Sequence, residues 1–302
     1  MSLPEPWLHL IVDDLSGPGR LDAWVSSRVD GLSRRRAAEM ISSGEITVAG
    51  SRTVGGRALA PGESVEVWSR PAPERWPARP DPDTDLAVVA ETELFIVINK
   101  PPGIPTTPRT RDEAGTLAGA IAARFPECAP LGRSNGDSGL LQRLDRQTSG
   151  LVVAARTHEA FEALWDAQKA DLMIKTYLAV TDAGPPRIPP VVDEPLSPRG
   201  PKGRKMVTGR GGKRSITRFE VVRDDGSRML VRATMTKGAR HQIRAHLAHA
   251  GHPIVGDSLY GAPEAGETRR HLLHCAGLTF PHPDGNTGQV SFDTAIPYDL
   301  YL

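Results

Sequence analysis

The sequence predicts an α+β fold with a mixed, mostly antiparallel central sheet flanked by helices and loops, preceded by a small N-terminal α/β domain. Three observations predict it: strand-like stretches outnumber helical ones, their spacing lacks the regular alternation of a doubly wound fold, and a proline-rich stretch divides the chain. With 302 residues, 39% of them hydrophobic and 24% charged, the chain can form about two globular domains.

The first expected domain spans residues 15–68. Its first helix is predicted by four apolar residues at helical spacing, before a break at Gly31. These four residues are Leu21, Trp24, Val25 and Val29. A second helix is expected from its N-cap Ser33 through Ser42, and the stretches EITVAG and ESVEVW then predict two short strands.

Residues 69–85 carry five prolines and no periodicity, so we expect a semi-rigid linker. The remaining residues, 86–302, are expected to form one larger domain. Its strands are predicted in LAVVA, LFIVIN, LVVAA, MIKTYLAVT and SRMLVRATM. Its helices are predicted by the stripe Leu117, Ile121 and Phe125, by the stripe Phe161, Leu164 and Trp165 that starts near Thr157, and by RHQIRAHLAHA, which ends at Gly251 and Pro253.

Composition limits the class of protein. No apolar run approaches the roughly 18 residues that cross a bilayer, and the N-terminus lacks the features of a signal peptide. Cys128 and Cys275 are far apart and in no metal-ligand spacing, so we expect reduced thiols in a cytoplasmic protein. No spare apolar stripe is visible, and we therefore expect a monomer.

The net charge of +1 does not indicate a type of partner, but the distribution of charge along the chain does. Residues 199–218 contain eight Lys or Arg and no acid. A glycine-rich basic loop of this kind suits a polyanion, and the alternative is an ordinary solvated loop.

Three arginines stand at the start of the second expected helix, where they oppose the helix dipole unless an anion is nearby. With the stretch SGEITVAGSRTV and a closing strand, this order resembles the S4 RNA-binding domain over about residues 20–68. The resemblance implies that Arg34, Arg35 and Arg36 contact phosphates of structured RNA. The alternative is a helix–strand unit that docks on the larger domain.

The stretch QRLDRQTSGLVVAA places one acid, Asp145, between Arg143 and Arg146, just before an apolar strand. A surface turn is the ordinary interpretation of such a stretch. Four further blocks occur with it along the chain: NKPPG, KTYLAV, TKGARHQIRAHLAHAGHPIVGDSLYG and HLLHCAGLTFPHP. Their order resembles that of the RluA-type pseudouridine synthases, across roughly residues 86–302.

The resemblance implies that Asp145 is the catalytic aspartate of an enzyme that cuts the C1′–N1 bond of a uridine in RNA and rejoins the base through C5. It implies no cofactor and no metal, and RNA as the partner; we expect ribosomal RNA, with transfer RNA as the alternative. A carboxylate that acts on the sugar must be ionised, and nearby cations favour the ionised form. Glycoside hydrolases commonly pair two carboxylates, whereas one acid among cations suits rearrangement better than hydrolysis.

The resemblance also implies roles for five other residues. Arg244 would be the ion-pair partner of the aspartate, and Arg143 would help to extrude the target nucleotide. Tyr177 would stack on the uracil and take part in proton transfer, while Ile243 and Leu273 would be apolar walls around the base. Each has an ordinary alternative: a strand aromatic, a surface charge or a core side chain.

Two rival interpretations stay open. Gln142 stands where many members of the family have histidine. The first rival is therefore a catalytically impaired RNA-binding protein that has lost this histidine. A metalloenzyme is the second rival, because four histidines fall within twelve residues. They are His241, His246, His249 and His252. Their spacing does not form one helical face and the HExxH pattern is absent, which counts against a metal site.

Overall fold

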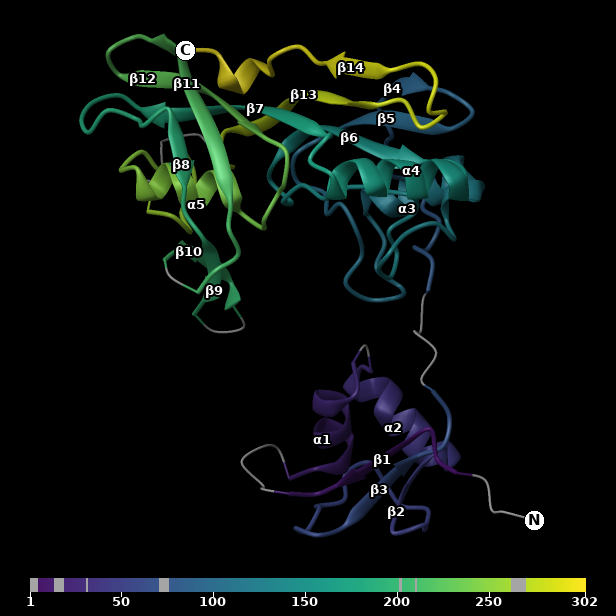
Figure 1. Cartoon of the computed structure of the whole chain (residues 1–302). Helices are drawn as coiled ribbons and strands as arrows, with labels where there is room; N and C mark the ends of the chain where they lie inside the picture. Colours follow the sequence, from purple (N-terminus) through teal and green to yellow (C-terminus); the bar gives the residue numbers. More distant parts are fainter. Residues whose placement is uncertain are drawn as a thin grey trace. The chain divides into compact units, whose positions relative to one another are not determined.

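The computed structural model describes residues 5–13, 19–30, 32–70, 76–200, 203–209, 211–261 and 270–302. The chain divides into two compact units, Met1–Arg75 and Trp76–Leu302 (Figure 1). The expected helix break at Gly31, the start of the first domain at residue 15, part of the proline-rich segment and two of the eight basic residues, Lys202 and Arg210, lie outside the described residues.

The first unit packs two helices on a three-stranded antiparallel sheet of order β1-β3-β2. Its elements are β1 (Leu8–Ile11), α1 (Leu21–Arg28), α2 (Arg34–Ser43), β2 (Ile46–Val48) and β3 (Ser64–Val67). Trp24 and its apolar neighbours at helical spacing are buried in a core of their own. Ser33 accepts a hydrogen bond from the Arg36 amide at the start of α2, which confirms the predicted N-cap.

The second unit is built on a nine-stranded sheet within the described residues, of order β4-β5-β6-β13-β7-β12-β11-β8 with β14 beside β13. Its strands are β4 (Val88–Glu91), β5 (Phe95–Lys100), β6 (Ser149–Ala155), β7 (Ile174–Asp182), β8 (Val191–Asp193), β11 (Ile216–Asp224), β12 (Arg228–Met235), β13 (Leu273–Pro281) and β14 (Gln289–Asp293). Strand β13 pairs parallel to β6 and antiparallel to β7. The predicted α+β class with a mixed, mostly antiparallel sheet is confirmed.

Three helices, α3 (Leu117–Arg124), α4 (His158–Lys169) and α5 (Gln242–His249), lie on one side of this sheet (Figure 1). Thr116 and Thr157 cap α3 and α4 by accepting the amides of Gly119 and Ala160. The sheet and these helices enclose one large apolar core. No helix in the described part of the chain is both long and apolar enough to cross a bilayer.

The second half of the proline-rich segment packs on the second unit. Ala78 is buried in its core, and Asp81 accepts a hydrogen bond from the Gly115 amide over 2.6 Å. A side chain at Gly119 would bring its Cβ to 2.8 Å from the carbonyl oxygen of Arg79, so glycine permits this close approach. Residues 76–85 are thus an ordered part of the second unit.

The basic stretch expected as a loop contains regular structure. Strands β9 (Leu196–Arg199) and β10 (Lys205–Thr208) form a separate antiparallel hairpin, which we call the basic arm. The expectation of a loop is wrong here because Leu196 and Met206 have an apolar surface to cover, formed by Ala245 of α5 and by Tyr260. In the sequence, the many Lys and Arg residues nearby make the two apolar anchor residues hard to recognise.

Candidate active site

The turn that carries Asp145 is held on both sides by the segment that follows β5. Thr106 accepts a hydrogen bond from the Leu144 amide over 3.1 Å and donates to the Leu144 carbonyl over 2.7 Å. The Gly103 amide donates to the Arg146 carbonyl over 2.8 Å. The backbone on either side of Asp145 is therefore fixed by the NKPPG segment and the residues just after it.

Lys100, at the end of β5, also contacts the turn that carries Asp145. Its ammonium is fully buried and donates to the carbonyl oxygens of Pro101, Ile104 and Arg146. Burial lowers the pKa of Lys100 to about 7, although the charge of Asp145 opposes this shift. The lysine thus belongs to the electrostatic surroundings of Asp145.

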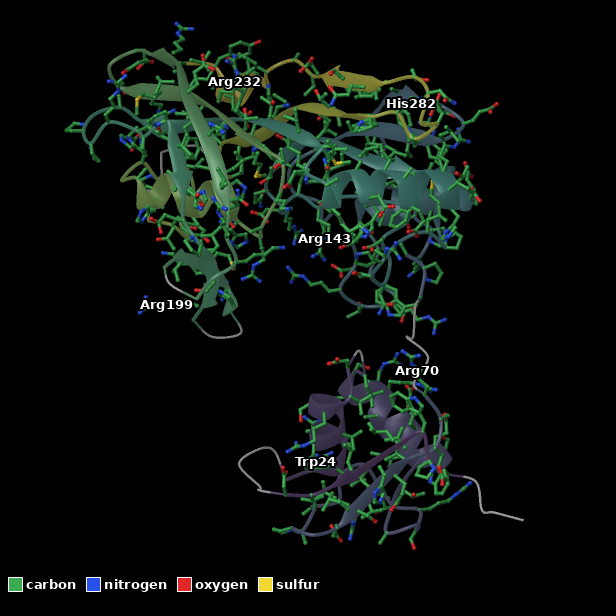
Figure 2. The ribbon with its side chains drawn as sticks, viewed as in Figure 1. Trp24, Arg70, Arg143, Arg199, Arg232 and His282 are labelled. Atoms are coloured by element: carbon green, nitrogen blue, oxygen red, sulfur yellow. The ribbon has the colours of Figure 1, made fainter. Side chains whose placement is uncertain are left out.

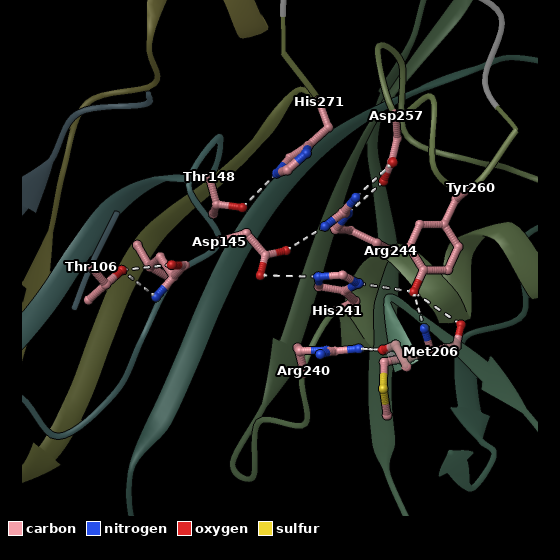
Figure 3. Close-up of polar contacts among 12 residues, drawn as sticks. Thr106, Asp145, Thr148, Met206, Arg240, His241, Arg244, Asp257, Tyr260 and His271 are labelled. Atoms are coloured by element: carbon pink, nitrogen blue, oxygen red, sulfur yellow. Dashed lines mark hydrogen bonds and ion pairs between the residues drawn. The ribbon is translucent and has the colours of Figure 1, made fainter. Parts of the chain in front are cut away.

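A chain of three charged side chains forms the centre of the site (Figure 3). Arg244 of α5 donates from Nη1 to Oδ2 of Asp145 over 2.7 Å. The same guanidinium grips Asp257 with two parallel hydrogen bonds, from Nε over 2.7 Å and from Nη2 over 2.9 Å. Burial alone would lower the pKa of Arg244, but the hydrogen bond with Asp257 and the charges of both carboxylates leave it raised.

Asp257 is 2% exposed and Arg244 is 6% exposed, whereas about a quarter of the Asp145 side chain is accessible. The buried pair therefore fixes the guanidinium, and the guanidinium in turn orients the accessible carboxylate. Such an arrangement leaves one carboxylate oxygen, Oδ1 of Asp145, for a substrate.

His241 lies on the other side of this carboxylate. Its Nε2 is 3.6 Å from Oδ1 of Asp145, and its Nδ1 is 3.3 Å from the Tyr260 hydroxyl. Burial lowers the pKa of His241, opposed by the charge of Asp145. Nearby, His271 Nε2 is 2.7 Å from the hydroxyl of Thr148, and burial lowers its pKa to about 4.

Tyr177 lies on β7, opposite Cys275 of β13, and is buried. Burial raises the pKa of Tyr177 well above its ordinary value, and the nearby charge of Asp145 adds to the shift. Ile243 and Leu273 are buried in the same core cluster. Leu273 and Cys275 alternate with His274 along β13, so they share one face of the sheet with Tyr177.

Four arginines were predicted to contact RNA. Arg143 is exposed on the helix-covered side of the sheet, and it makes no hydrogen bond or ion pair within the described chain (Figure 2). The other three belong to the first unit: Arg34 pairs with Asp22, while Arg35 and Arg36 pair with Glu39. The geometry thus unites Asp145 with Arg244 directly and brings Tyr177 within electrostatic range.

The side chain of Gln142 donates to the carbonyl of Leu151 over 3.3 Å, and its Oε1 has no partner among the described residues. The four clustered histidines contact different partners. His246 bonds Thr217 and Glu194, His249 bonds Thr208, His252 bonds Asp182 and Pro186, and His241 faces Tyr260 and Asp145. The described residues contain no group of three or more His, Cys, Asp or Glu arranged to hold a metal ion.

Sequence reasoning did not assign five residues to this centre, and it considered one of them, His241, only as a metal ligand. The five are Lys100, His241, Asp257, Tyr260 and His271. Each lies within a block that the sequence analysis singled out or next to one. In the structure four of them are buried polar or charged side chains and His241 is half-buried, and a buried polar group requires a partner from elsewhere in the fold. Asp257 and Tyr260 stand in the stretch GDSLYG, and no local signal there predicts their contacts with Arg244 and with Met206.

Comparison with known proteins agrees with this geometry. Residues 94–249 match the family model described as RNA pseudouridylate synthase. A ribosomal large subunit pseudouridine synthase D of Neisseria meningitidis is 33% identical over 95% of this chain and 78% of its own length. A protein of the same name from Zymomonas mobilis is 32% identical over 94% of this chain and 92% of its own length.

A solved structure, human RNA pseudouridylate synthase domain containing 1, is 25% identical and superposes with a TM-score of 0.57 over 71% of this chain and 84% of its own. Fold and sequence thus define an enzyme that modifies RNA. The chain belongs to the RNA pseudouridylate synthase family. It is an RNA pseudouridine synthase, an isomerase that rearranges uridine within an RNA chain.

Proposed function

We propose that this enzyme converts specific uridines of ribosomal RNA into pseudouridine, with Asp145 as its catalytic carboxylate. The observation that carries the proposal is the 2.7 Å bond from Arg244 to Asp145, backed by the buried pair of Arg244 with Asp257. Names of relatives support ribosomal RNA, because two of them are called ribosomal large subunit pseudouridine synthase D.

The proposed reaction breaks the C1′–N1 bond of the target uridine and forms a bond from C1′ to C5 of the same base. The proton at C5 leaves, and N1 gains a proton. Asp145 acts on the ribose, where it needs a negative charge and one free oxygen. Arg244 holds the other oxygen, so the carboxylate points at the sugar before the substrate arrives, which saves the cost of orientation.

The base must leave its helix to be reached, at a cost of a few kcal/mol. We propose that Tyr177 stacks on the extruded uracil, with Ile243 and Leu273 beside it. Arg143 is exposed two residues before Asp145. Its guanidinium is free to enter the RNA where the base has left, and we propose this role for it.

We also propose that residues 15–68 act as an S4-type RNA-binding domain. It is joined to the catalytic domain of residues 86–302 through the proline-rich residues 69–85, whose second half packs on the second unit. Arg34 and Arg35 are exposed at the start of a helix that has no acid in its first turn. RNA phosphates would replace the carboxylates that now pair with these side chains. Because ribosomal RNA is the proposed substrate, we propose that the protein works in the cytoplasm, as a monomer and without a metal.

The direct test compares wild type with Asp145→Asn on large-subunit ribosomal RNA transcribed in vitro with tritium at C5 of uridine. Each pseudouridine formed releases one tritium into water. Wild type should release it, whereas Asp145→Asn should release none and still bind the RNA within a few fold of wild type. Release by Asp145→Asn at more than one hundredth of the wild-type rate would refute the catalytic role.

A catalytically impaired RNA-binding protein is the alternative that Gln142 raises. Gln142 bonds the backbone of β6 rather than Asp145, which favours a positioning role for this residue and retained activity. Wild-type protein that binds ribosomal RNA but releases no tritium would favour the alternative. Transfer RNA labelled in the same way decides between the two substrates.

A further inference from the structure

The basic arm connects to the catalytic carboxylate through Tyr260. The Tyr260 hydroxyl accepts a hydrogen bond from the Met206 amide over 2.9 Å and donates to the Met206 carbonyl over 3.0 Å. Met206 is the second residue of β10, so both bonds go to the backbone of the arm. Arg240 adds a third tie by donating to the carbonyl of Gly203.

Two cations lie close to the ring of Tyr260. Lys205 of the arm lies 4.9 Å from the ring centre, and the Arg244 guanidinium lies 5.1 Å from it. A cation at this distance is attracted to the electron-rich face of the ring. One tyrosine thus contacts the arm and the arginine that orients Asp145.

His241 completes the connection between Tyr260 and Asp145 (Figure 3). Its backbone φ is +55°, a left-handed conformation that is uncommon outside glycine. It precedes α5 as the N-cap residue, yet its side chain makes no capping bond. Instead the ring spans the gap between the Tyr260 hydroxyl and Oδ1 of Asp145. Strain of this kind persists where the surroundings enforce it, often at functional sites.

The hydrogen bonds of Tyr260 determine which nitrogen of the His241 ring carries the proton. The hydroxyl of Tyr260 has a single proton, which goes to the Met206 carbonyl, so towards His241 the oxygen can only accept. Nδ1 of His241 must therefore carry the proton of a neutral ring, which leaves Nε2 bare and turned to Asp145. A bare Nε2 donates nothing to Oδ1, and that oxygen stays available.

We propose that Tyr260 fixes the tautomer of His241 and thereby makes the catalytic carboxylate depend on the basic arm. While Met206 holds the hydroxyl, Oδ1 of Asp145 is free to act. When the arm moves away, the hydroxyl proton turns to Nδ1, the ring proton shifts to Nε2, and His241 donates to Oδ1 and ties it.

This inference rests on the proposed role of Asp145, and it makes His241 and Tyr260 positioning residues. Besides Asp145 and the Tyr260 hydroxyl, the charged groups that act on the ring of His241 are Arg244, Arg240 and Asp257. None of the last three accepts a proton from Nδ1 in the structure. The tautomer therefore depends on Tyr260.

The first measurement is the tautomer itself. In full-length protein labelled with nitrogen-15 at histidine, the His241 signals are assigned by their loss in His241→Asn. At pH 7.5 wild type should carry its proton on Nδ1, and Tyr260→Phe should carry it on Nε2. A proton on Nε2 in wild type would overturn the proposal, and this measurement stands whether or not Asp145 proves catalytic.

The second measurement is tritium release from the ribosomal RNA transcript. Tyr260→Phe should lower kcat about tenfold, with KM and RNA affinity within twofold of wild type. His241→Asn keeps the left-handed backbone accessible but is too short to reach Asp145, so it should stay within about threefold of wild type.

The double variant Tyr260→Phe with His241→Asn should recover the rate of His241→Asn alone. A purely structural role would make it the slowest of the three. A double variant as slow as Tyr260→Phe would overturn the proposal, and so would a tautomer change in Tyr260→Phe without a fall in kcat. Tyr298→Phe, on an exposed tyrosine of the same unit, is the control and should match wild type.

Discussion

Arg244 bonds Asp145 through one nitrogen and Asp257 through two others, so a single guanidinium joins an accessible carboxylate to a buried one. Asp145 stands 99 positions before Arg244 in the sequence, and Asp257 stands 13 positions after it. The relationship explains why an arginine is needed at position 244. A lysine has the charge but not the planar fork of donors.

Arg244→Lys should therefore reduce activity and stability together. The three donors of an ammonium sit on one nitrogen and cannot replace bonds made by three separate guanidinium nitrogens. Hydrogen bonds to charged groups contribute about 1.5–3 kcal/mol each. We expect kcat to fall about 100-fold and the free energy of unfolding to fall by about 2–4 kcal/mol, measured by tritium release and urea denaturation. Arg232→Lys, at an exposed pair with Glu220, is the matched control and should change stability by less than about 1 kcal/mol. Equal effects of the two variants would contradict the expectation.

Tyr177→Phe should separate stacking from proton transfer. The ring stays, so RNA affinity and KM should remain within about twofold of wild type. The hydroxyl is lost, and kcat should fall about 100-fold if the proton moves through it. Tyr177→Leu removes the ring as well and should raise KM by about tenfold, because stacking on a base contributes about 1–3 kcal/mol. An unchanged kcat in Tyr177→Phe would leave the tyrosine only its stacking role.

Replacing Arg34, Arg35 and Arg36 together with glutamine should weaken RNA binding without changing kcat. Neutralising a phosphate releases counterions, so the plot of log affinity against log salt should become shallower by about 0.7–0.9 for each phosphate that the variant no longer neutralises. Filter binding at several salt concentrations measures this slope. Arg232→Gln in the second unit should leave it unchanged. An unaltered slope in the triple variant would remove these arginines from the RNA interface.

Acid should destabilise the second unit through two buried histidines. Burial lowers the pKa of both His271 and His274 to about 4. The unfolded chain binds protons at about pH 6.5 and the folded one does not, so stability is lost as the pH falls from about 6.5 towards 4. At 1.36 kcal/mol per pH unit, each histidine contributes a loss on the order of 3 kcal/mol.

Urea denaturation between pH 7.5 and 4.5 measures this loss. His274→Asn should flatten the profile, whereas His158→Asn, at an exposed position, should not. A profile that stays level in wild type would show that neither histidine is held in its neutral form.

Much of the fold could be predicted from local signals. The helical stripe of Leu117, Ile121 and Phe125 and the caps Ser33 and Thr157 correspond to helices with those ends. Strand β13 was not predicted, because a central strand buried on both faces lacks the alternation that marks a half-exposed one. Strand β1 was also missed. It pairs with β3, more than fifty residues later, and no local pattern reveals such pairing.

Some residues of the candidate site could be predicted from the sequence and others could not. The resemblance to the RluA-type family implied the pairing of Asp145 with Arg244, and the two residues are bonded in the structure. Asp257, His241 and Tyr260 could not be assigned from the sequence. Their roles depend on which buried groups lack other partners, and that is a property of the folded chain.

The place of β13 in the sheet has a consequence for synthesis of the protein. This strand stands between β6 and β7, although both are made about a hundred residues earlier. As the nascent chain leaves the ribosome, the two halves of the sheet lack the strand that joins them until residues 273–281 emerge. Asp145 and Tyr177 are thus kept apart in an incomplete chain, and the competence to alter RNA should arise in one late step of folding.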